Sequence, residues 1–241
     1  MTSPSFSDLH ERILAHPGKK YLDTLMTYSV SKNILAGNGI QLRKLLEYLE
    51  DPNRIPELWA LDKREHLRNL HSEVVRHFHN FLASVRTLVD HTRVVMRSQS
   101  ISEAHRAEYQ KAVSKQFASD PLARFMQDLR NYMLHKTIPV TSFELAWQKD
   151  TDRTDSSVYV NLDKMADWQG WSLAGRIFIE ANRPQIRMMT LVDNYEDKVR
   201  KFYEWFCPCF LEYYKKEIDG VTALQTAWNK GLSDDDKDNT K

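Results

Sequence analysis

Residues 63–98 read KREHLRNLHSEVVRHFHNFLASVRTLVDHTRVVMRS, and this stretch decides the fold class. Its apolar residues recur at steps of three and four, with one gap at Thr92: Leu67, Leu70, Val74, Phe78, Phe81, Val85, Leu88 and Val95. This period predicts one amphipathic helix about 50 Å long, because each helical residue adds about 1.5 Å. A similar stripe predicts a second long helix within residues 172–218, which Pro184 should kink or divide. That stripe consists of Leu191, Val192, Tyr195, Val199, Phe202, Phe206, Phe210 and Tyr213.

Shorter elements lie between the two long helices. A medium helix is expected over residues 103–118, with Ser100 or Ser102 as its cap. Another should start at Ser119-Asp120-Pro121 and end before Pro139. The period then changes to two, because apolar residues alternate at Phe143, Leu145 and Trp147 and again at Val158, Val160 and Leu162. This alternation predicts a β-hairpin within residues 138–162, inserted in a mainly α-helical bundle of two long and two medium helices.

The remaining segments complete one expected domain, residues 1–230. Residues 1–50 read as a weakly ordered N-terminal extension, with short helices at 21–35 and 40–49 separated by Gly37-Asn38-Gly39. The core is residues 63–218. Asp219-Gly220 should end the second long helix, and a short helix follows to Lys230. Residues 231–241 form an acidic tail that we expect to be disordered.

Composition excludes several classes of protein. Among 241 residues, 34 Lys and Arg face 33 Asp and Glu, and 41% of residues are hydrophobic, which is the balance of a globular chain. Two cysteines cannot build a disulfide framework. The N-terminus lacks an apolar signal peptide, and no window resembles a membrane span, so we expect a cytoplasmic protein that does not bind membranes. Residues 54–136 carry fourteen Lys and Arg against nine Asp and Glu, which indicates an anion-binding face or a solvated helix surface.

Common catalytic and metal-binding motifs are missing from the sequence. It contains no Walker-type loop, no Gly-x-Gly-x-x-Gly, no Gly-x-Ser-x-Gly and no His-Glu-x-x-His. His71, His77 and His79 do not share a helical face, and Cys207-Pro208-Cys209 reads as two core thiols. We therefore expect no metal and no cofactor. The aromatic residues between Phe202 and Tyr214 are expected in the core or in a dimer interface.

The remaining chemical candidate is Arg130-Asn131-Tyr132-Met133-Leu134-His135. Histidine titrates near neutral pH and can move protons, and the planar guanidinium of arginine fits phosphate. Together, His135 as general acid or base and Arg130 as phosphate clamp could cleave RNA without a metal. Asn131 would orient the site, and Lys136 could add a phosphate contact.

This pattern resembles the HEPN superfamily, whose signature is an arginine, four to six residues and then a histidine, often with a polar residue after the arginine. The specific resemblance covers residues 125–135, within a helical core of residues 63–218. It implies an all-helical, HEPN-like domain that acts as a metal-independent endoribonuclease on an RNA substrate, in a stress, phage-defence or toxin–antitoxin setting. It also implies a homodimer, with a protein partner such as an antitoxin. Arg64 with His71, and Arg86 with His91, match the bare spacing as well.

Geometry leaves a second interpretation open. On a straight helix, Arg130 and His135 diverge by about 140° and are about 7.5 Å apart along the axis. A shared site therefore needs a loosened last turn, or a dimer in which each copy contributes to a common cleft. Alternatively, Arg130 pairs with a carboxylate such as Asp128 or Glu144, and His135 caps the helix. The protein would then be a non-catalytic helical interaction or dimerisation module.

Overall fold

The computed structural model describes residues 6–98, 100–139, 141–148 and 153–238. It confirms a mainly α-helical fold with an inserted β-hairpin. The chain divides into two compact units, Ser31–Phe202 and a second unit that combines Met1–Val30 with Tyr203–Lys241. The sequence predicted a single domain, because no linker composition marks a boundary. In the structure both boundaries between the units fall inside continuous helices.

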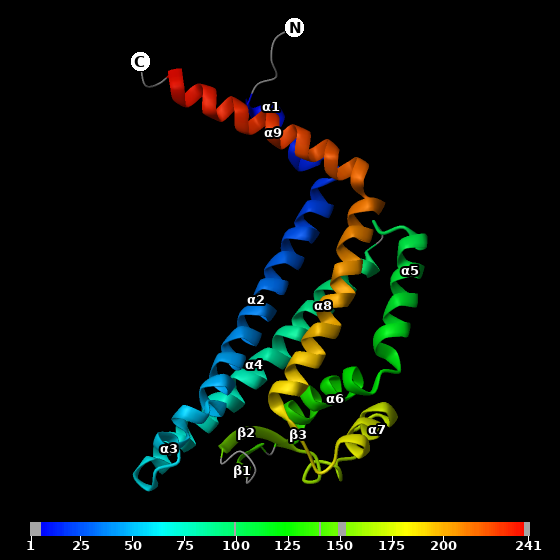
Figure 1. Cartoon of the computed structure of the whole chain (residues 1–241). Coiled ribbons are helices and arrows are strands. Elements are labelled where there is room, and N and C mark those ends of the chain that lie inside the picture. The colour runs from blue at the N-terminus through cyan, green and yellow to red at the C-terminus, as the bar shows by residue number, and fades with distance from the viewer. Residues whose placement is uncertain (1–5, 99, 140, 149–152, 239–241) are drawn as a thin grey trace. The chain divides into compact units, whose positions relative to one another are not determined.

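The unit Ser31–Phe202 contains most of the elements, labelled in Figure 1. In chain order they are the second part of α2 (Lys19–Glu50), the 3-10 turn η1 (Pro52–Arg54), α3 (Ile55–Leu58), the 3-10 turn η2 (Leu61–Lys63), α4 (Arg64–Arg97), α5 (Glu103–Val113), the π-helical turn η3 (Ser114–Ala118), α6 (Pro121–His135), β1 (Thr141–Gln148), β2 (Arg153–Asn161), α7 (Leu173–Asn182), β3 (Gln185–Arg187) and the first part of α8 (Met188–Tyr213).

The long helix α4 confirms the periodic stripe that decides the fold class. Its buried face includes Val74, Phe78, Phe81, Val85 and Leu88 of that stripe. The gap at Thr92 is resolved locally, because the buried hydroxyl of Thr92 donates to the carbonyl of Leu88 at 2.9 Å. A threonine can therefore occupy a core position without leaving its hydroxyl unsatisfied.

Helix α2 runs unbroken through the segment that we expected to separate two short helices. Each mid-helix glycine costs about 0.5–1 kcal/mol relative to alanine, whereas full burial of one leucine gives about 1.5–3 kcal/mol. Leu42 and Leu46 on α2 are fully buried, so packing outweighs the glycine penalty. Gly39 also permits a close approach of α8, since a Cβ there would lie 2.9 Å from Glu196 Oε2. Glu196 pairs with Arg43 of α2.

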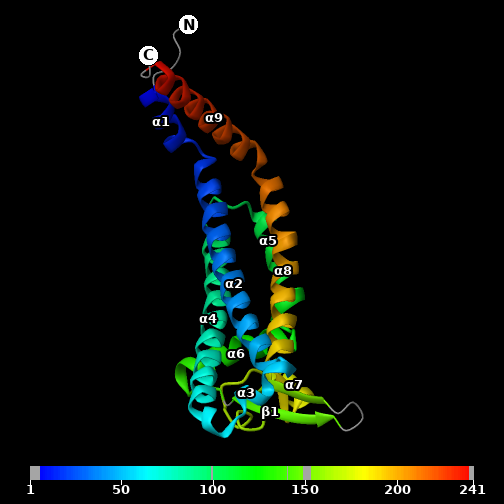
Figure 2. The same ribbon diagram turned by 60° about the vertical axis from the view of Figure 1, so that its left-hand side comes forward.

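The sheet extends the predicted hairpin by one strand. β1 and β2 pair antiparallel, with Phe143 opposite Val158, and β3 adds antiparallel to β2. β2 is therefore the central strand of the three, and Figure 2 shows the hairpin at the same end of the unit as α3 and α7. The strand β3 was not expected. Pro184, which we expected to kink or divide the second long helix, lies where it is divided into α7 and α8, with β3 between them.

The second unit is built from α1 (Phe6–Ala15), the start of α2, the end of α8 and α9 (Lys215–Asp238). Aromatic rings fill its core: Tyr21 stacks on Tyr214 at a centroid distance of 4.1 Å, and Phe210 is fully buried. Among the aromatic residues between Phe202 and Tyr214, which we expected in the core or in a dimer interface, Phe210 and Tyr214 are therefore core residues. α9 continues through Gly220 and as far as Asp238, where we expected a helix end and a disordered tail, and residues 239–241 lie outside the described residues.

A buried histidine on α5 gives the fold a pH dependence. His105 is fully buried, and burial lowers its pKa below 6.5, against a smaller opposing effect of Glu108. The unfolded chain therefore binds more protons below about pH 6.5, and the free energy of unfolding should fall as the pH drops through that value. Urea unfolding at about pH 5.5 should show a lower midpoint than at about pH 7.5. In His105→Gln the difference should shrink, and an unchanged difference would contradict this assignment.

Candidate functional site

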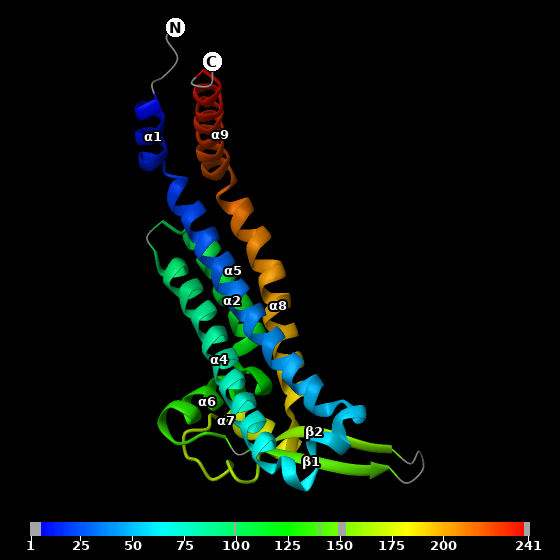
Figure 3. The same ribbon diagram turned by 90° about the vertical axis from the view of Figure 1, so that its left-hand side faces the viewer.

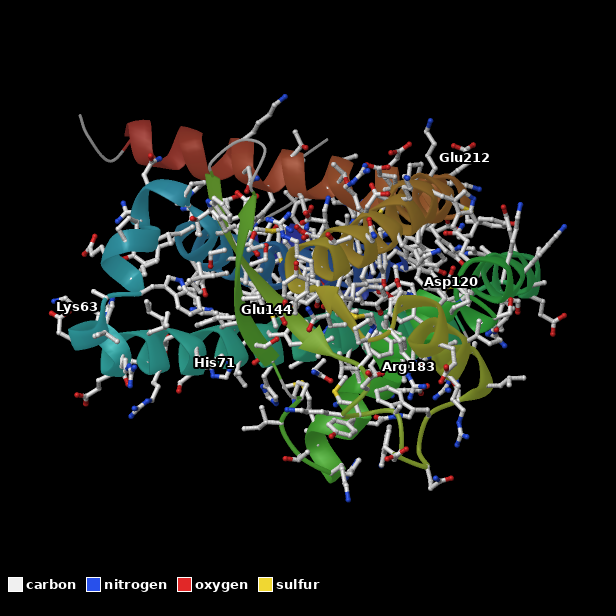
Figure 4. The ribbon with its side chains drawn as sticks, turned by 60° about the horizontal axis from the view of Figure 1, so that its bottom comes forward. Lys63, His71, Asp120, Glu144, Arg183 and Glu212 are labelled. Carbon is white, nitrogen blue, oxygen red and sulfur yellow. The ribbon has the colours of Figure 1, made fainter. Side chains whose placement is uncertain are left out.

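Helix α6 positions the predicted catalytic residues. It starts where the sequence predicts, because Asp120 Oδ1 accepts a hydrogen bond from the backbone N–H of Ala123 at 2.8 Å, and Pro121 is the first helical residue. Its inner face is buried and consists of Ala123, Phe125, Met126, Asp128, Leu129 and Tyr132. Figure 4 labels Asp120 at the start of this helix. Arg130, Asn131 and His135 of the motif therefore occupy the remaining, more accessible faces.

Aromatic stacking holds α6 against α7. The Phe125 ring lies 4.6 Å from Phe178 and 5.3 Å from Trp171, stacked on both. Tyr132 also stacks on Trp171, at a centroid distance of 5.8 Å. The indole N–H of Trp171 donates to the carbonyl of Met165 at 2.8 Å, so the ring is fixed by a hydrogen bond as well as by packing.

A buried carboxylate ties the two helices together. Asp128 is 5% exposed, and its Oδ2 accepts hydrogen bonds from the backbone N–H of Ser172 at 2.9 Å and from its hydroxyl at 2.6 Å. Ser172 caps α7, so the carboxylate also sits at the positive end of that helix. A Cβ on Gly175 would lie 2.6 Å from the same oxygen, which explains the glycine in the first turn of α7. The Asp128 carboxylate is therefore engaged in hydrogen bonds at the start of α7.

Arg130 lies half-buried beside a second arginine. Both Arg130 and Arg86 line a cavity of about 30 Å³, together with Leu82, Val85, Val89, Met126, Gln127 and Tyr195. Arg86 Nε donates to Asp90 at 2.6 Å, whereas Arg130 has no hydrogen bond or ion pair within the described part of the chain. Tyr195, which also lines this cavity, has a raised pKa because of its burial and the nearby charge of Asp120.

The carboxylates that we considered as partners of Arg130 are engaged elsewhere. Asp128 accepts from Ser172, and Glu144 Oε2 accepts from the side-chain amide of Gln185 at 2.8 Å. The suggested ion pair of Arg130 with either residue is therefore wrong. Arg130 lines the same cavity as Arg86 and has no carboxylate partner among the described residues.

His135 is the last residue of α6, and its side chain is exposed. The helix keeps its hydrogen bonding to its end, since the carbonyl of Tyr132 accepts from the backbone N–H groups of Lys136 at 2.8 Å and Thr137 at 3.2 Å. Asn131 is half-buried and Lys136 is exposed. Arg130 and His135 therefore diverge as on any regular helix, and the structure does not bring them together within one chain.

Two other histidines that match the spacing have structural partners. His71 Nε2 lies 2.5 Å from Thr141 Oγ1, and its ring meets Phe143 edge-on, so it joins α4 to β1. Figure 4 labels His71 on α4 and Glu144 on the strand. His91 Nδ1 lies 2.7 Å from Ser31 Oγ and joins α4 to α2. Both histidines are therefore engaged in packing between elements.

A hollow at the start of α6 is lined by Lys115 from the basic middle of the sequence and by residues of α8. This hollow, of about 580 Å³, contains Lys115, Lys198 and Lys201 with Asp120 and Asp197. Lys198 pairs with Asp120 at 2.8 Å and Lys201 with Asp197 at 2.6 Å. These ion pairs neutralise much of the positive charge, so the hollow does not carry the strong anion-binding field that the sequence allowed.

Potential metal ligands are scattered in the described ranges of the chain. No group of three or more His, Cys, Asp or Glu side chains there could hold a metal ion. Cys207 and Cys209 are half-buried and form no disulfide. The pair Cys207-Pro208-Cys209 thus lies inside α8, as expected for thiols of a helix.

An exposed apolar surface on the hairpin was not predicted. The side chains of Leu145 and Trp147 on β1 are 41% and 62% exposed. Alternation predicted the strand correctly, but it could not show that the outer half of the hairpin extends beyond the helices that would cover it. Figure 3 shows this extension of β1 and β2 past α3.

The chain matches no protein-family model, no curated protein and no solved structure. None of the helices in the described part of the chain combines the length and the apolar character needed to cross a lipid bilayer.

Proposed function

We propose that this protein is a non-catalytic helical module that self-associates. The observation that carries the proposal is the run Glu144–Trp147 on β1, where every side chain is exposed and the apolar residues Leu145 and Trp147 share one face. Exposed apolar residues on a strand at the edge of a sheet are typical of an interaction surface.

The geometry of α6 favours this function over catalysis by a single chain. A general acid or base must reach the atom that Arg130 would neutralise, which requires both side chains within a few ångströms of one phosphate. His135 lies at the exposed end of a regular helix, and Arg130 turns toward the cavity beside Arg86. One chain therefore offers two separate groups.

A metal-independent endoribonuclease of HEPN type remains the second candidate, and one observation favours it. Arg86 and Arg130 line one cavity, and Arg130 has no carboxylate partner among the described residues, whereas Arg86 pairs with Asp90. An arginine without a carboxylate partner suits a phosphate oxygen. A second copy would have to supply His135, and the RNA target, antitoxin, defence setting and cytoplasmic location all depend on this candidate.

One preparation tests both functions. Purified protein should show a dimer in sedimentation velocity that dissociates on dilution, and no cleavage of a structured RNA pool in EDTA above the level of Arg130→Ala and His135→Ala. A monomer at every concentration would contradict self-association. Cleavage by the wild type that both variants lose would establish the nuclease, because a contaminant would cleave equally in all three samples.

A further inference from the structure

The strand β1 is an unusually unprotected edge. The sheet order is β1-β2-β3, and no strand in the described part of the chain pairs with the outer side of β1. Proteins usually protect such edges with lysine, proline or a bulge, because unpaired backbone groups invite another strand. Thr141–Gln148 contains neither proline nor lysine, and its only charge is Glu144.

One face of β1 carries the apolar side chains, and its two ends differ in exposure. Phe143, Leu145 and Trp147 alternate onto one face, on which Phe143 meets the ring of His71 and pairs across the strands with the buried Val158. Further out, Leu145 stands opposite Ser156 and Trp147 opposite Thr154, and both apolar side chains are exposed. The face therefore contacts α4 at one end and is exposed to solvent at the other.

We propose that β1 pairs antiparallel with β1 of a second copy of this chain, with Leu145 on the two-fold axis. This inference rests on the self-association proposed above and identifies its surface. Pairing two identical edges is an isologous contact, so the assembly closes as a dimer. The sheet then continues across the axis in the order β3-β2-β1-β1-β2-β3.

The sequence of β1 selects this register. Directly opposite residues in a sheet share a face, so the axis must pass beside a residue and not between two residues. An axis at Glu144 would oppose two carboxylates, which is unfavourable. An axis at Ala146 would leave Phe143 without an opposite residue in β1 of the second copy, because that strand ends at Gln148.

An axis at Leu145 gives favourable side-chain pairs on both faces of the sheet. It places Leu145 opposite Leu145 and Phe143 opposite Trp147 on each side, which joins the apolar faces of the two copies. Aromatic pairs across strands are among the more stabilising ones. On the other face, Glu144 stands opposite Ala146 of the second copy, so no like charges meet.

Cysteine crosslinking tests the register. Residues on the axis have Cα atoms about 4.5–5.5 Å apart, within the range of a disulfide. Mild oxidation should therefore crosslink Leu145→Cys into a covalent dimer. Ala146→Cys should not crosslink, because its two Cα atoms would be about 8 Å apart. The oxidised wild type reports any crosslinking through Cys207 and Cys209.

Charge substitution provides a second, independent measurement. Leu145→Lys opposes two ammonium groups on the axis and should weaken the dimer at least tenfold in sedimentation, whereas Leu173→Lys, at a 79% exposed site on α7, should leave it unchanged. A dimer that survives Leu145→Lys, or that crosslinks through Ala146→Cys instead of Leu145→Cys, would overturn this register while self-association stands. A wild type that stays monomeric would overturn both.

Discussion

Replacing Phe125 by alanine should lower the free energy of unfolding by about 3–5 kcal/mol. The Phe125 ring is fully buried and stacks on Phe178 of α7 and on Trp171, which precedes α7, so the substitution removes both ring contacts. The cavity left behind cannot close easily, because Trp171 is held by its hydrogen bond to Met165. Urea unfolding followed by circular dichroism measures this loss.

Leu134→Ala is the matched control on the same helix. Leu134 is 48% exposed, so its truncation should change the stability by no more than about 0.5 kcal/mol. Similar losses for Phe125→Ala and Leu134→Ala would mean that α6 is not packed on α7 through the face described above.

Asp128→Ala should cost about 2–4 kcal/mol. The substitution removes an acceptor that two donors of Ser172 share and leaves the part-buried backbone N–H of Ser172 without this partner. It also removes a negative charge from the N-terminus of α7, where the helix dipole favours one. The measured quantity is again the free energy of unfolding, at a pH near 7.

Two further variants separate the parts of this effect. Asp128→Asn keeps a carbonyl acceptor but no charge, and should lose about half as much as Asp128→Ala. Ser172→Ala removes one donor and the cap of α7, and the double variant with Asp128→Ala should lose less than the two single variants combined. Additive losses would show that the two side chains do not interact.

Most of the fold followed from periodicity. The step of three and four in residues 63–98 predicted α4, and Asp120-Pro121 predicted the start of α6, because both signals are local. The continuity of α2 could not be predicted from periodicity. Its glycines are tolerated because its leucines are buried and because Glu196, distant in sequence, approaches Gly39. The strand β3 pairs only through β2, so its short sequence carries no signal of its own.

The candidate site was less predictable. Spacing identified Arg130 and His135, but it could not show that Asp128 binds Ser172 or that Arg86 stands beside Arg130, because these contacts join separate helices. Likewise, alternation marked Leu145 and Trp147 as apolar positions of a strand, and only the arrangement of the helices leaves them exposed.

The division into two units has a consequence for biosynthesis. The unit Ser31–Phe202 is contiguous, so a ribosome releases all of it before the last part of the chain appears. The other unit joins the first thirty residues to the last segment, and Tyr21 must wait for Tyr214 before its ring can stack. During that interval the early aromatic residues of the nascent chain lack their native partners. Chaperones that recognise exposed apolar segments therefore have their longest opportunity at the N-terminal end of this chain.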